Sequence, residues 1–93
     1  MIIGFADSET ERFFRDGDCP AQWRAFARVA ARKLDMLDAA PTLDASRSPP
    51  GGRLEALKGD REGQFSIRVN DQWRLCFFWT KAGPDRVELV DYH

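Results

Sequence analysis

The sequence has few of the residues from which metal centres and disulfide scaffolds are built. It contains two cysteines and one histidine among 93 residues. Cys19 and Cys76 have neither metal-ligand spacing nor a cysteine-rich context, so we interpret both as reduced thiols. One histidine with scattered carboxylates is not a convincing ligand set. The sequence therefore predicts neither a bound metal nor any other cofactor.

The chain also lacks an excess of charge and any long apolar run. Its 14 lysines and arginines nearly balance 15 aspartates and glutamates. Bulk charge therefore predicts no partner, and nucleic acid is neither demanded nor excluded. No window is apolar enough to span a bilayer, and residues 1–6 lack the basic start of a signal peptide. We expect one soluble domain over residues 1–93, cytoplasmic and without membrane contact.

Capping residues and apolar spacing predict a short strand and two helices in the first half of the chain. The strand is expected at residues 2–5. An S-x-x-E pattern beginning at Ser8 is typical of a helix capping box, and Gly17 suits the end of that helix. Pro20 suits the first turn of a longer helix that ends before Pro41. The apolar side of the longer helix recurs at spacings of three and four: Trp23, Phe26, Ala27, Ala30, Leu34 and Leu37.

The second half of the chain is strand-like over four stretches with short turns between them: residues 53–57, 64–69, 73–79 and 86–90. This order predicts an α+β domain with an N-terminal strand and with two helices packed on one face of a mainly antiparallel sheet. The basic side of the longer helix, with Arg24, Arg28 and Arg32, is interpreted as a solvated face. A surface for a partner or for RNA is the alternative.

The register of one hairpin carries a specific inference. A three-residue loop at 70–72 keeps one face of the hairpin apolar by pairing these residues: Val69 with Trp73, Ile67 with Leu75 and Phe65 with Phe77. The same register sets Arg68 opposite Arg74, which is unfavourable by up to about 1 kcal/mol. Such a pair suits a bound phosphate, and truncating Arg74 should then leave the melting temperature unchanged or slightly higher. The alternative is screening by neighbouring carboxylates: Glu55, Glu88 or Asp91.

The chain ends in Asp91, Tyr92 and His93, which include its only histidine and its only tyrosine. A lone histidine at a frayed terminus is usually just solvated. Here the alternating residues 87–90 lead directly into the end and would hold it as a strand. A histidine in a fixed position is a candidate proton-transfer group because its pKa lies near neutrality.

These residues together supply the parts for metal-free RNA cleavage. The reaction needs a base for the 2′-hydroxyl, cations beside the nonbridging oxygens and an acid for the 5′-oxygen. Arg68 and Arg74, with Lys58 near the edge of the same face, are the candidate cations. His93 is a candidate acid or base, and Tyr92 could stack on a splayed base.

Three segments in order resemble one known family: PPGGRLEALKGDR at 49–61, FSIRVNDQWR at 65–74 and VDYH at 90–93. They resemble the HigB-type (plasmid maintenance killer) branch of the RelE toxin superfamily. The resemblance implies a RelE-like fold and the toxin of a type II toxin–antitoxin pair, an endoribonuclease that cuts mRNA in the ribosomal A site. It also implies inhibition by a small helix-turn-helix antitoxin, with DNA contacted only through the antitoxin complex.

Carried over residue by residue, the resemblance assigns the catalytic group to the following positions: Lys58, Arg74, Asp91, Tyr92 and His93. The expected phosphate-binding residues are Arg53, Arg61 and Arg68. Some relatives have a histidine where this chain has Glu55, so acid–base work falls on Asp91 and His93, in an order that the sequence does not assign. Because the chain is not basic, its affinity for free RNA should be weak. The alternatives are a non-enzymatic toxin that binds a protein such as a topoisomerase, and an inactive co-repressor.

Overall fold

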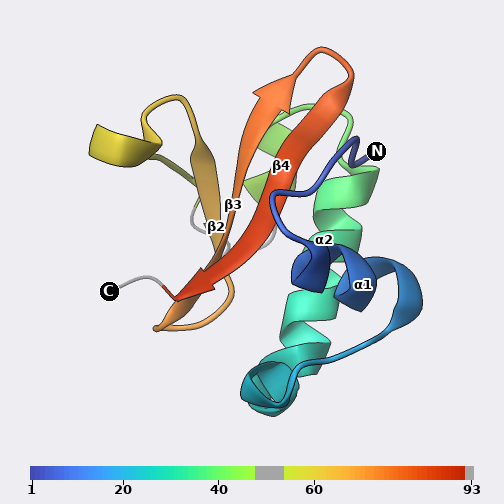
Figure 1. Cartoon of the computed structure of the whole chain (residues 1–93). Coiled ribbons are helices and arrows are strands. Elements are labelled where there is room, and N and C mark those ends of the chain that lie inside the picture. Colours follow the sequence, from blue (N-terminus) through green and yellow to red (C-terminus); the bar gives the residue numbers. More distant parts are fainter. Residues whose placement is uncertain (48–53, 92–93) are drawn as a thin grey trace.

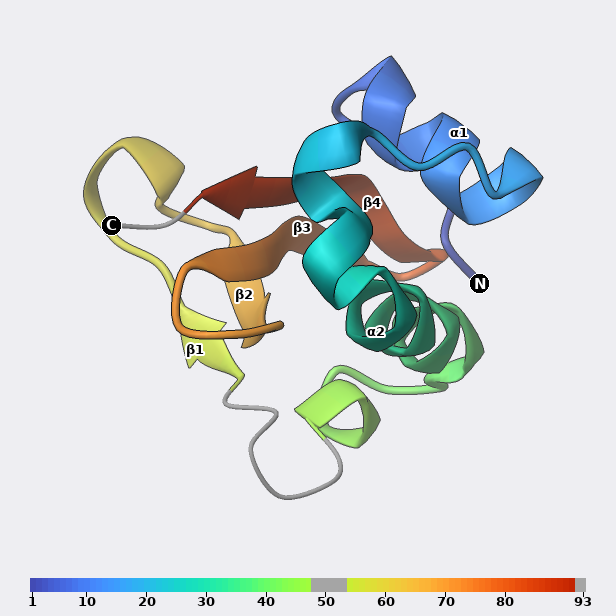
Figure 2. The same cartoon turned by 90° about the horizontal axis from the view of Figure 1, so that it is seen from below.

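The structure, a computed structural model, describes residues 1–47 and 54–91. Two α-helices and a four-stranded sheet are joined by 3-10 turns, in this order: α1 (Ser8–Asp16), η1 (Ala21–Phe26), α2 (Ala27–Ala39), η2 (Asp44–Arg47), β1 (Glu55–Ala56), η3 (Gly59–Arg61), β2 (Phe65–Arg68), β3 (Trp73–Thr80) and β4 (Gly83–Asp91). Neighbouring strands are all antiparallel. The helices lie on one side of the sheet and η3 on the other (Figures 1 and 2). The α+β prediction is confirmed.

Residues 1–6 run beside β4 without forming a full strand. Phe5 forms a single parallel bridge with Val87 of β4. The amide nitrogens of Ile3 and Ala6 donate to the carbonyl oxygens of Pro84 and Val87, at 2.8 and 3.0 Å. The predicted strand at 2–5 is therefore reduced to a bridge along the edge of β4, because helix α1 begins immediately afterwards.

Helix α1 begins one residue away from the predicted cap. Asp7 has extended backbone angles, and its Oδ1 accepts a hydrogen bond from the Thr10 amide at 2.7 Å. Ser8 is already helical. The Asp7 carboxylate is a strong N-cap acceptor, and its negative charge is favourable at the positive end of the helix dipole. Gly17 ends the helix as predicted, with a φ of 75°.

The longer helix is divided at its start. The residues after Pro20 form the 3-10 turn η1, and α2 begins only at Ala27. Phe26 at the junction has a φ of −127°, outside the helical range, and its ring lies 5.4 Å from that of Trp73. This contact with β3 fixes the break that the apolar spacing alone did not indicate.

The core lies between α2 and one face of the sheet. Its buried members come from both layers: Ala30, Leu34 and Leu37 of α2, and Ile67, Leu75, Phe77, Val87 and Leu89 of the strands. The predicted hairpin register is confirmed in the paired residues: Phe65 with Phe77, Ile67 with Leu75 and Arg68 with Arg74. Alternation along each strand therefore leaves a second face that the helices do not cover.

Two strands differ in extent from the prediction. In the described residues β1 contains only Glu55 and Ala56, because the chain turns into η3 after Lys58. Strand β4 begins earlier than predicted, at Gly83. The Thr80 hydroxyl accepts from the amides of Ala82 and Gly83, both at 3.2 Å, which tightens the β3–β4 turn.

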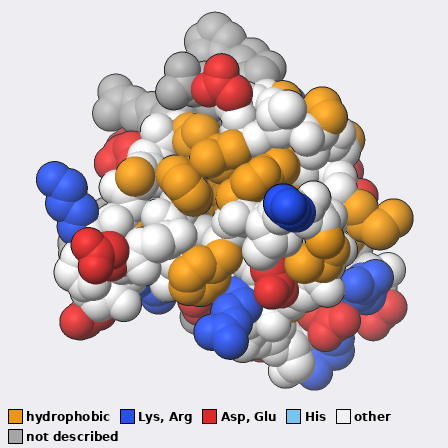
Figure 3. Space-filling view, turned by 90° about the horizontal axis from the view of Figure 1, so that it is seen from above, with side chains coloured by type: hydrophobic (Ala, Val, Ile, Leu, Met, Phe, Trp, Pro, Cys, Tyr) orange, Lys and Arg blue, Asp and Glu red, His pale blue; other side chains and the backbone are white. Residues whose placement is uncertain are grey.

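One end of the molecule presents apolar side chains in the middle of a ring of charged ones (Figure 3). Among the large apolar residues that the structure describes, Met1 and Ile3 are the exposed ones, at 78% and 45%. Within the described ranges, every helix is too short or too polar to cross a bilayer.

Candidate active site

The sheet face opposite the helices is polar. We call it the open face and define it by these strand residues: Ser66, Arg68, Arg74, Cys76, Phe78 and Glu88. Strand register aligns Glu55, Ser66, Cys76 and Glu88 in one row across the sheet, and Arg68, Arg74 and Val90 in the next. The open face arises from the same alternation that buries the apolar residues on the helix side.

Arg74 is held rigidly at the centre of this face. Only 9% of the residue is exposed. Its Nε donates to the hydroxyl of the fully buried Ser66 at 2.8 Å, and its Nη2 lies 3.2 Å from Oε1 of Glu55. The guanidinium is therefore oriented by one buried hydrogen bond and one partly exposed ion pair, a fixed direction that transition-state stabilisation requires.

Arg68 is more exposed than Arg74 and is paired with Asp71 of the hairpin loop. Each of the two facing arginines thus has a carboxylate partner, Glu55 for Arg74 and Asp71 for Arg68. Screening was the alternative to a bare pair. The structure supports screening: Glu55 is one of the predicted carboxylates, whereas the sequence pattern did not indicate Asp71. Repulsion between the two arginines is therefore not the main determinant of their energy. The expectation that truncating Arg74 leaves the melting temperature unchanged or slightly higher loses its basis.

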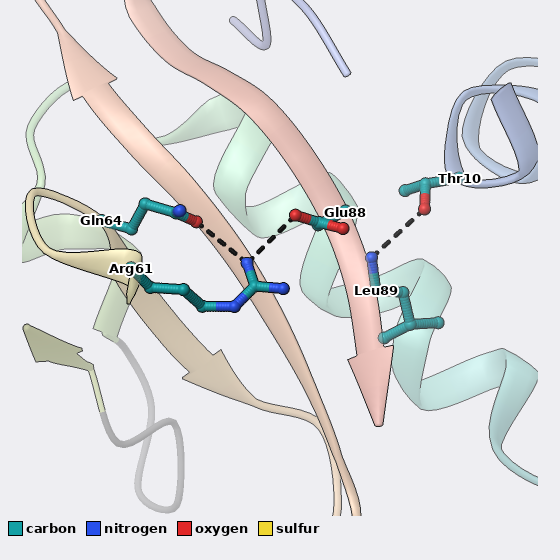
Figure 4. Close-up of polar contacts among 5 residues, drawn as sticks. All are labelled: Thr10, Arg61, Gln64, Glu88 and Leu89. Atoms are coloured by element: carbon teal, nitrogen blue, oxygen red, sulfur yellow. Dashed lines mark hydrogen bonds and ion pairs between the residues drawn. The ribbon is translucent and has the colours of Figure 1, made fainter. Parts of the chain in front are cut away.

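Arg61 reaches from η3 across to the last strand. Its Nη1 donates to Gln64 Oε1 at 3.2 Å and to Glu88 Oε2 at 3.0 Å (Figure 4). Glu88 therefore partners Arg61 and not the facing arginines. Lys58 precedes η3 and is exposed to solvent. The η3 turn thus brings Arg61 to the open face, and Lys58 lies at the start of the turn.

Two buried polar residues support this arrangement and were not identified from the sequence. Ser66 orients Arg74 as described above. On the helix side, the buried Thr10 accepts a hydrogen bond from the Leu89 amide at 3.2 Å, which ties α1 to β4 (Figure 4). A serine or threonine hydroxyl in an amphipathic stretch carries no signal of its burial, because its partner lies on another element of the fold.

Cys76 lies fully buried in the row between Ser66 and Glu88. Burial raises the pKa of the Cys76 thiol, Glu88 adds to this effect, and the charges of Arg61 and Arg74 partly oppose it. The thiol is therefore protonated and shielded, and it is not a nucleophile at neutral pH.

The acidic residue of the predicted terminus lies on the other side of the sheet. Asp91 is opposite Trp73 in the register, on the side that the helices cover, and its Oδ2 accepts from Gln72 Nε2 at 2.9 Å. The described geometry does not bring its carboxylate to Arg74. Tyr92, His93 and Arg53 lie outside the described residues. The structure thus gathers Arg61, Arg68 and Arg74 on the open face, places Lys58 at the start of η3 and leaves Asp91 apart.

The remaining candidate sites are a metal centre and the basic side of α2. Among the described residues, no group of three or more histidine, cysteine or acidic side chains could hold a metal ion. A hollow of about 560 Å³ lies at the junction of η1 and α2, lined in part by Arg24, Arg28, Arg32, Phe26 and Val29. It belongs to the helix side, away from the open face.

Comparison with known proteins identifies relatives over nearly the whole chain. A profile described as the RelE-like toxin of type II toxin–antitoxin system HigB matches residues 3–93. Toxin HigB-1 of Vibrio cholerae serotype O1 is 40% identical over 96 residues, spanning 99% of this chain and 94% of that protein. Endoribonuclease HigB of Proteus vulgaris is 42% identical over 41 residues, spanning 44% of this chain and 45% of that protein.

A solved structure agrees with the fold. The YoeB–YefM complex from Staphylococcus aureus contains a chain that superposes with a TM-score of 0.60 at 15% identity, covering 100% of this chain and 98% of that one. At this identity the likeness supports the architecture only. The sequence matches carry the assignment, and with them we conclude that this chain belongs to the HigB-like, RelE-like toxins of type II toxin–antitoxin systems.

Proposed function

We propose that the protein is a ribosome-dependent endoribonuclease that cleaves mRNA in the A site and so arrests translation and growth. The observation that carries this proposal is the buried, oriented guanidinium of Arg74 on a face that also bears Arg68 and is flanked by Arg61 and Lys58. An oriented cation surrounded by further cations suits a reaction in which negative charge builds on a phosphate. The name Endoribonuclease HigB of the Proteus vulgaris relative gives independent support.

The proposed reaction is attack of the 2′-oxygen on the adjacent phosphorus, with cleavage of the bond to the 5′-oxygen. Arg74 and Lys58 would stabilise the charge that builds on the nonbridging oxygens. His93 and Asp91 are the proposed proton-transfer groups, and Tyr92 would position the scissile nucleotide. Because Asp91 lies on the helix side, its part is the least supported by geometry, and His93 would carry most of the proton transfer.

Phosphate binding would require Arg68 to exchange its partner. Its present partner Asp71 lies in the hairpin loop three residues after the end of β2, and the Asp71 side chain is 98% exposed. A pair this exposed contributes little, on the order of 0–1 kcal/mol. A phosphate can therefore replace Asp71 at small cost. Arg61 and Arg53 are proposed to contact further phosphates along the RNA.

The charge balance supports the proposed ribosome dependence. A chain with net charge −1 has little electrostatic attraction for free RNA. We expect purified protein to leave naked mRNA largely uncut and to cut the same mRNA in a 70S complex with an empty A site. Arg74→Met protein serves as the matched control for contaminating nuclease. Efficient cleavage of free RNA at physiological salt would contradict ribosome dependence, and no cleavage in either form would refute the nuclease function.

The partners and location follow from the same proposal. We propose a cytoplasmic toxin that is held inactive by a HigA-like helix-turn-helix antitoxin and that meets DNA only through that complex. The superposing Staphylococcus aureus chain is likewise part of a two-protein complex, YoeB–YefM. Co-expression with the product of the adjacent reading frame should restore growth and give a co-purifying complex. Growth arrest that persists under co-expression would exclude that neighbour as the antitoxin.

A further inference from the structure

A bulge in β4 carries an unusual backbone conformation. Arg86 has a φ of 51°, and no other non-glycine residue of the described ranges has a positive φ. Strand pairing changes register here, since Cys76 pairs with Glu88 whereas Phe78 pairs with Asp85. The left-handed region is sterically unfavourable for a residue with a Cβ, and glycine is common at such a bulge. Strain of this kind, which re-aims a side chain, often marks a functional position.

The re-aimed side chain lies over an aromatic ring. The guanidinium carbon of Arg86 is 5.8 Å from the centroid of Phe78. Phe78 follows Cys76 on the open face and is half-buried, outside the core. A Cβ built on Gly63 would lie 3.5 Å from its Cε1, so the loop after η3 contacts this ring. Arg86 and Phe78 thus form a cation–aromatic pair on the strands that carry Arg74 and Glu88.

The charge of Arg86 is not neutralised by a partner. Among the described residues its side chain forms no ion pair, and the neighbouring Asp85 carboxylate accepts from the Arg86 backbone amide at 2.8 Å. Arg15 on α1 is a useful contrast. It also stacks on a ring, 5.5 Å from Phe5, but it is paired with Glu11 at 3.0 Å and has an ordinary helical backbone. The charge of Arg15 is therefore neutralised within its own helix, whereas, in the described part of the chain, that of Arg86 is not.

We propose that Arg86 and Phe78 form a second RNA subsite, which stacks a base flanking the scissile phosphate held at Arg74. This inference rests on the proposed ribonuclease function. At about 3.3 Å per strand residue, Phe78 lies roughly 13 Å along β3 from Arg74, a span that a single strand covers within a few nucleotides. Guanidinium planes and aromatic rings stack on bases with little sequence preference, and a cation beside the ring adds attraction for the backbone.

The binding test uses a fluorescein-labelled single-stranded 12-mer of 2′-O-methyl RNA, which cannot be cut by 2′-oxygen attack. Fluorescence anisotropy at low ionic strength should show about tenfold weaker binding to Arg86→Gly, the scale of losing one stacked base. Arg15→Ala removes the same charge from a similar ring contact and should bind within twofold of wild type. Arg86→Gly should melt at the same or a higher temperature, because glycine relieves the left-handed strain.

Two further variants separate the explanations. Arg86→Asn tolerates the same backbone without the charge and should reproduce the loss of binding. Arg86→Lys keeps the charge without a planar group and should recover only part of it. Unchanged binding by Arg86→Gly overturns the subsite, and so does full recovery by lysine, which would reduce the contact to charge alone. Unchanged binding with a melting temperature several degrees lower would show a structural role instead, and this too overturns the subsite.

Cleavage in the programmed 70S complex distinguishes the two proposals. Arg86→Gly should cut about tenfold more slowly than wild type, by a similar factor whichever base flanks the cut. If the wild-type protein does not cut programmed mRNA, the nuclease function fails, and the anisotropy experiment alone decides whether Arg86 and Phe78 bind a nucleotide. If wild type and Arg86→Gly cut equally, the nuclease stands and the subsite is refuted.

Discussion

Removing the Arg74 side chain tests whether this residue contributes both to the stability of the fold and to RNA cleavage. Arg74 is 9% exposed, and its Nε is bonded to the Ser66 hydroxyl at 2.8 Å. Arg74→Ala leaves that buried hydroxyl without its partner, which costs about 1–3 kcal/mol. The ion pair with Glu55, a half-exposed residue, adds about 0–1 kcal/mol. We expect a loss of about 2–3 kcal/mol in the free energy of unfolding.

That loss corresponds to a fall of roughly 10–20 °C in melting temperature for a domain of this size. Thermal unfolding monitored by circular dichroism measures it directly. Single-turnover cleavage of programmed mRNA, measured well below the melting temperature and normalised to folded protein, should fall about 100-fold or more. The two losses have different causes, so a second variant must separate them.

The double variant Ser66→Ala/Arg74→Met provides that separation. Methionine fills part of the space of the arginine stem, and alanine removes the hydroxyl that would otherwise be unsatisfied. The double variant should be about 1 kcal/mol or more above Arg74→Met in stability, while its cleavage stays about 100-fold below wild type. Recovery of cleavage together with stability would refute a catalytic role for Arg74. A melting temperature of Arg74→Ala equal to or above that of wild type would refute the burial argument and favour the relief of charge repulsion.

Three further predictions concern other parts of the chain. Deleting Tyr92 and His93 should abolish growth arrest without lowering the melting temperature, whereas Asp91→Asn should retain most cleavage because its carboxylate lies on the helix side; arrest by the truncated protein at equal expression would contradict this assignment. In chemical denaturation, Gly83→Ala should lower the free energy of unfolding by about 2 kcal/mol or more, since a Cβ there would lie 2.2 Å from the Met1 carbonyl oxygen. Gly17→Ala should lower it by only about 1–2 kcal/mol, because a Cβ at Gly17 would have no atom within 4 Å. Burial raises the pKa of the Cys76 thiol, so iodoacetamide at pH 8 should modify Cys19 and spare Cys76; rapid labelling of both cysteines in the folded protein would contradict this. The protein should also lose stability relative to Cys76→Ala as the pH rises above about 8.5, where the thiol of the unfolded chain ionises; parallel stability curves against pH for the two proteins would contradict this.

The sequence by itself determined the elements whose signals are local. Spacings of three and four located the buried side of α2, and the left-handed preference of Gly17 located the end of α1. The hairpin register followed from alternation, because a shift of one residue would have moved every apolar side chain off the core face. That register also placed Arg68 opposite Arg74. One of the three segments that resemble HigB toxins, residues 65–74, spans this hairpin, so the register and the resemblance rest in part on the same residues.

The tertiary structure decided what surrounds those residues. Arg74 is buried, and its partners Ser66 and Glu55 come from the neighbouring strands. Arg61 contacts Glu88 because η3 folds back over the sheet. The bulge at Arg86 sets the pairing of β3 with β4 and so places Asp91 on the side of Trp73. These are contacts between residues on different elements of the fold, and their energies depend on burial and on the partner. Local sequence patterns report side-chain periodicity, whereas burial and partners arise only when separate segments pack together.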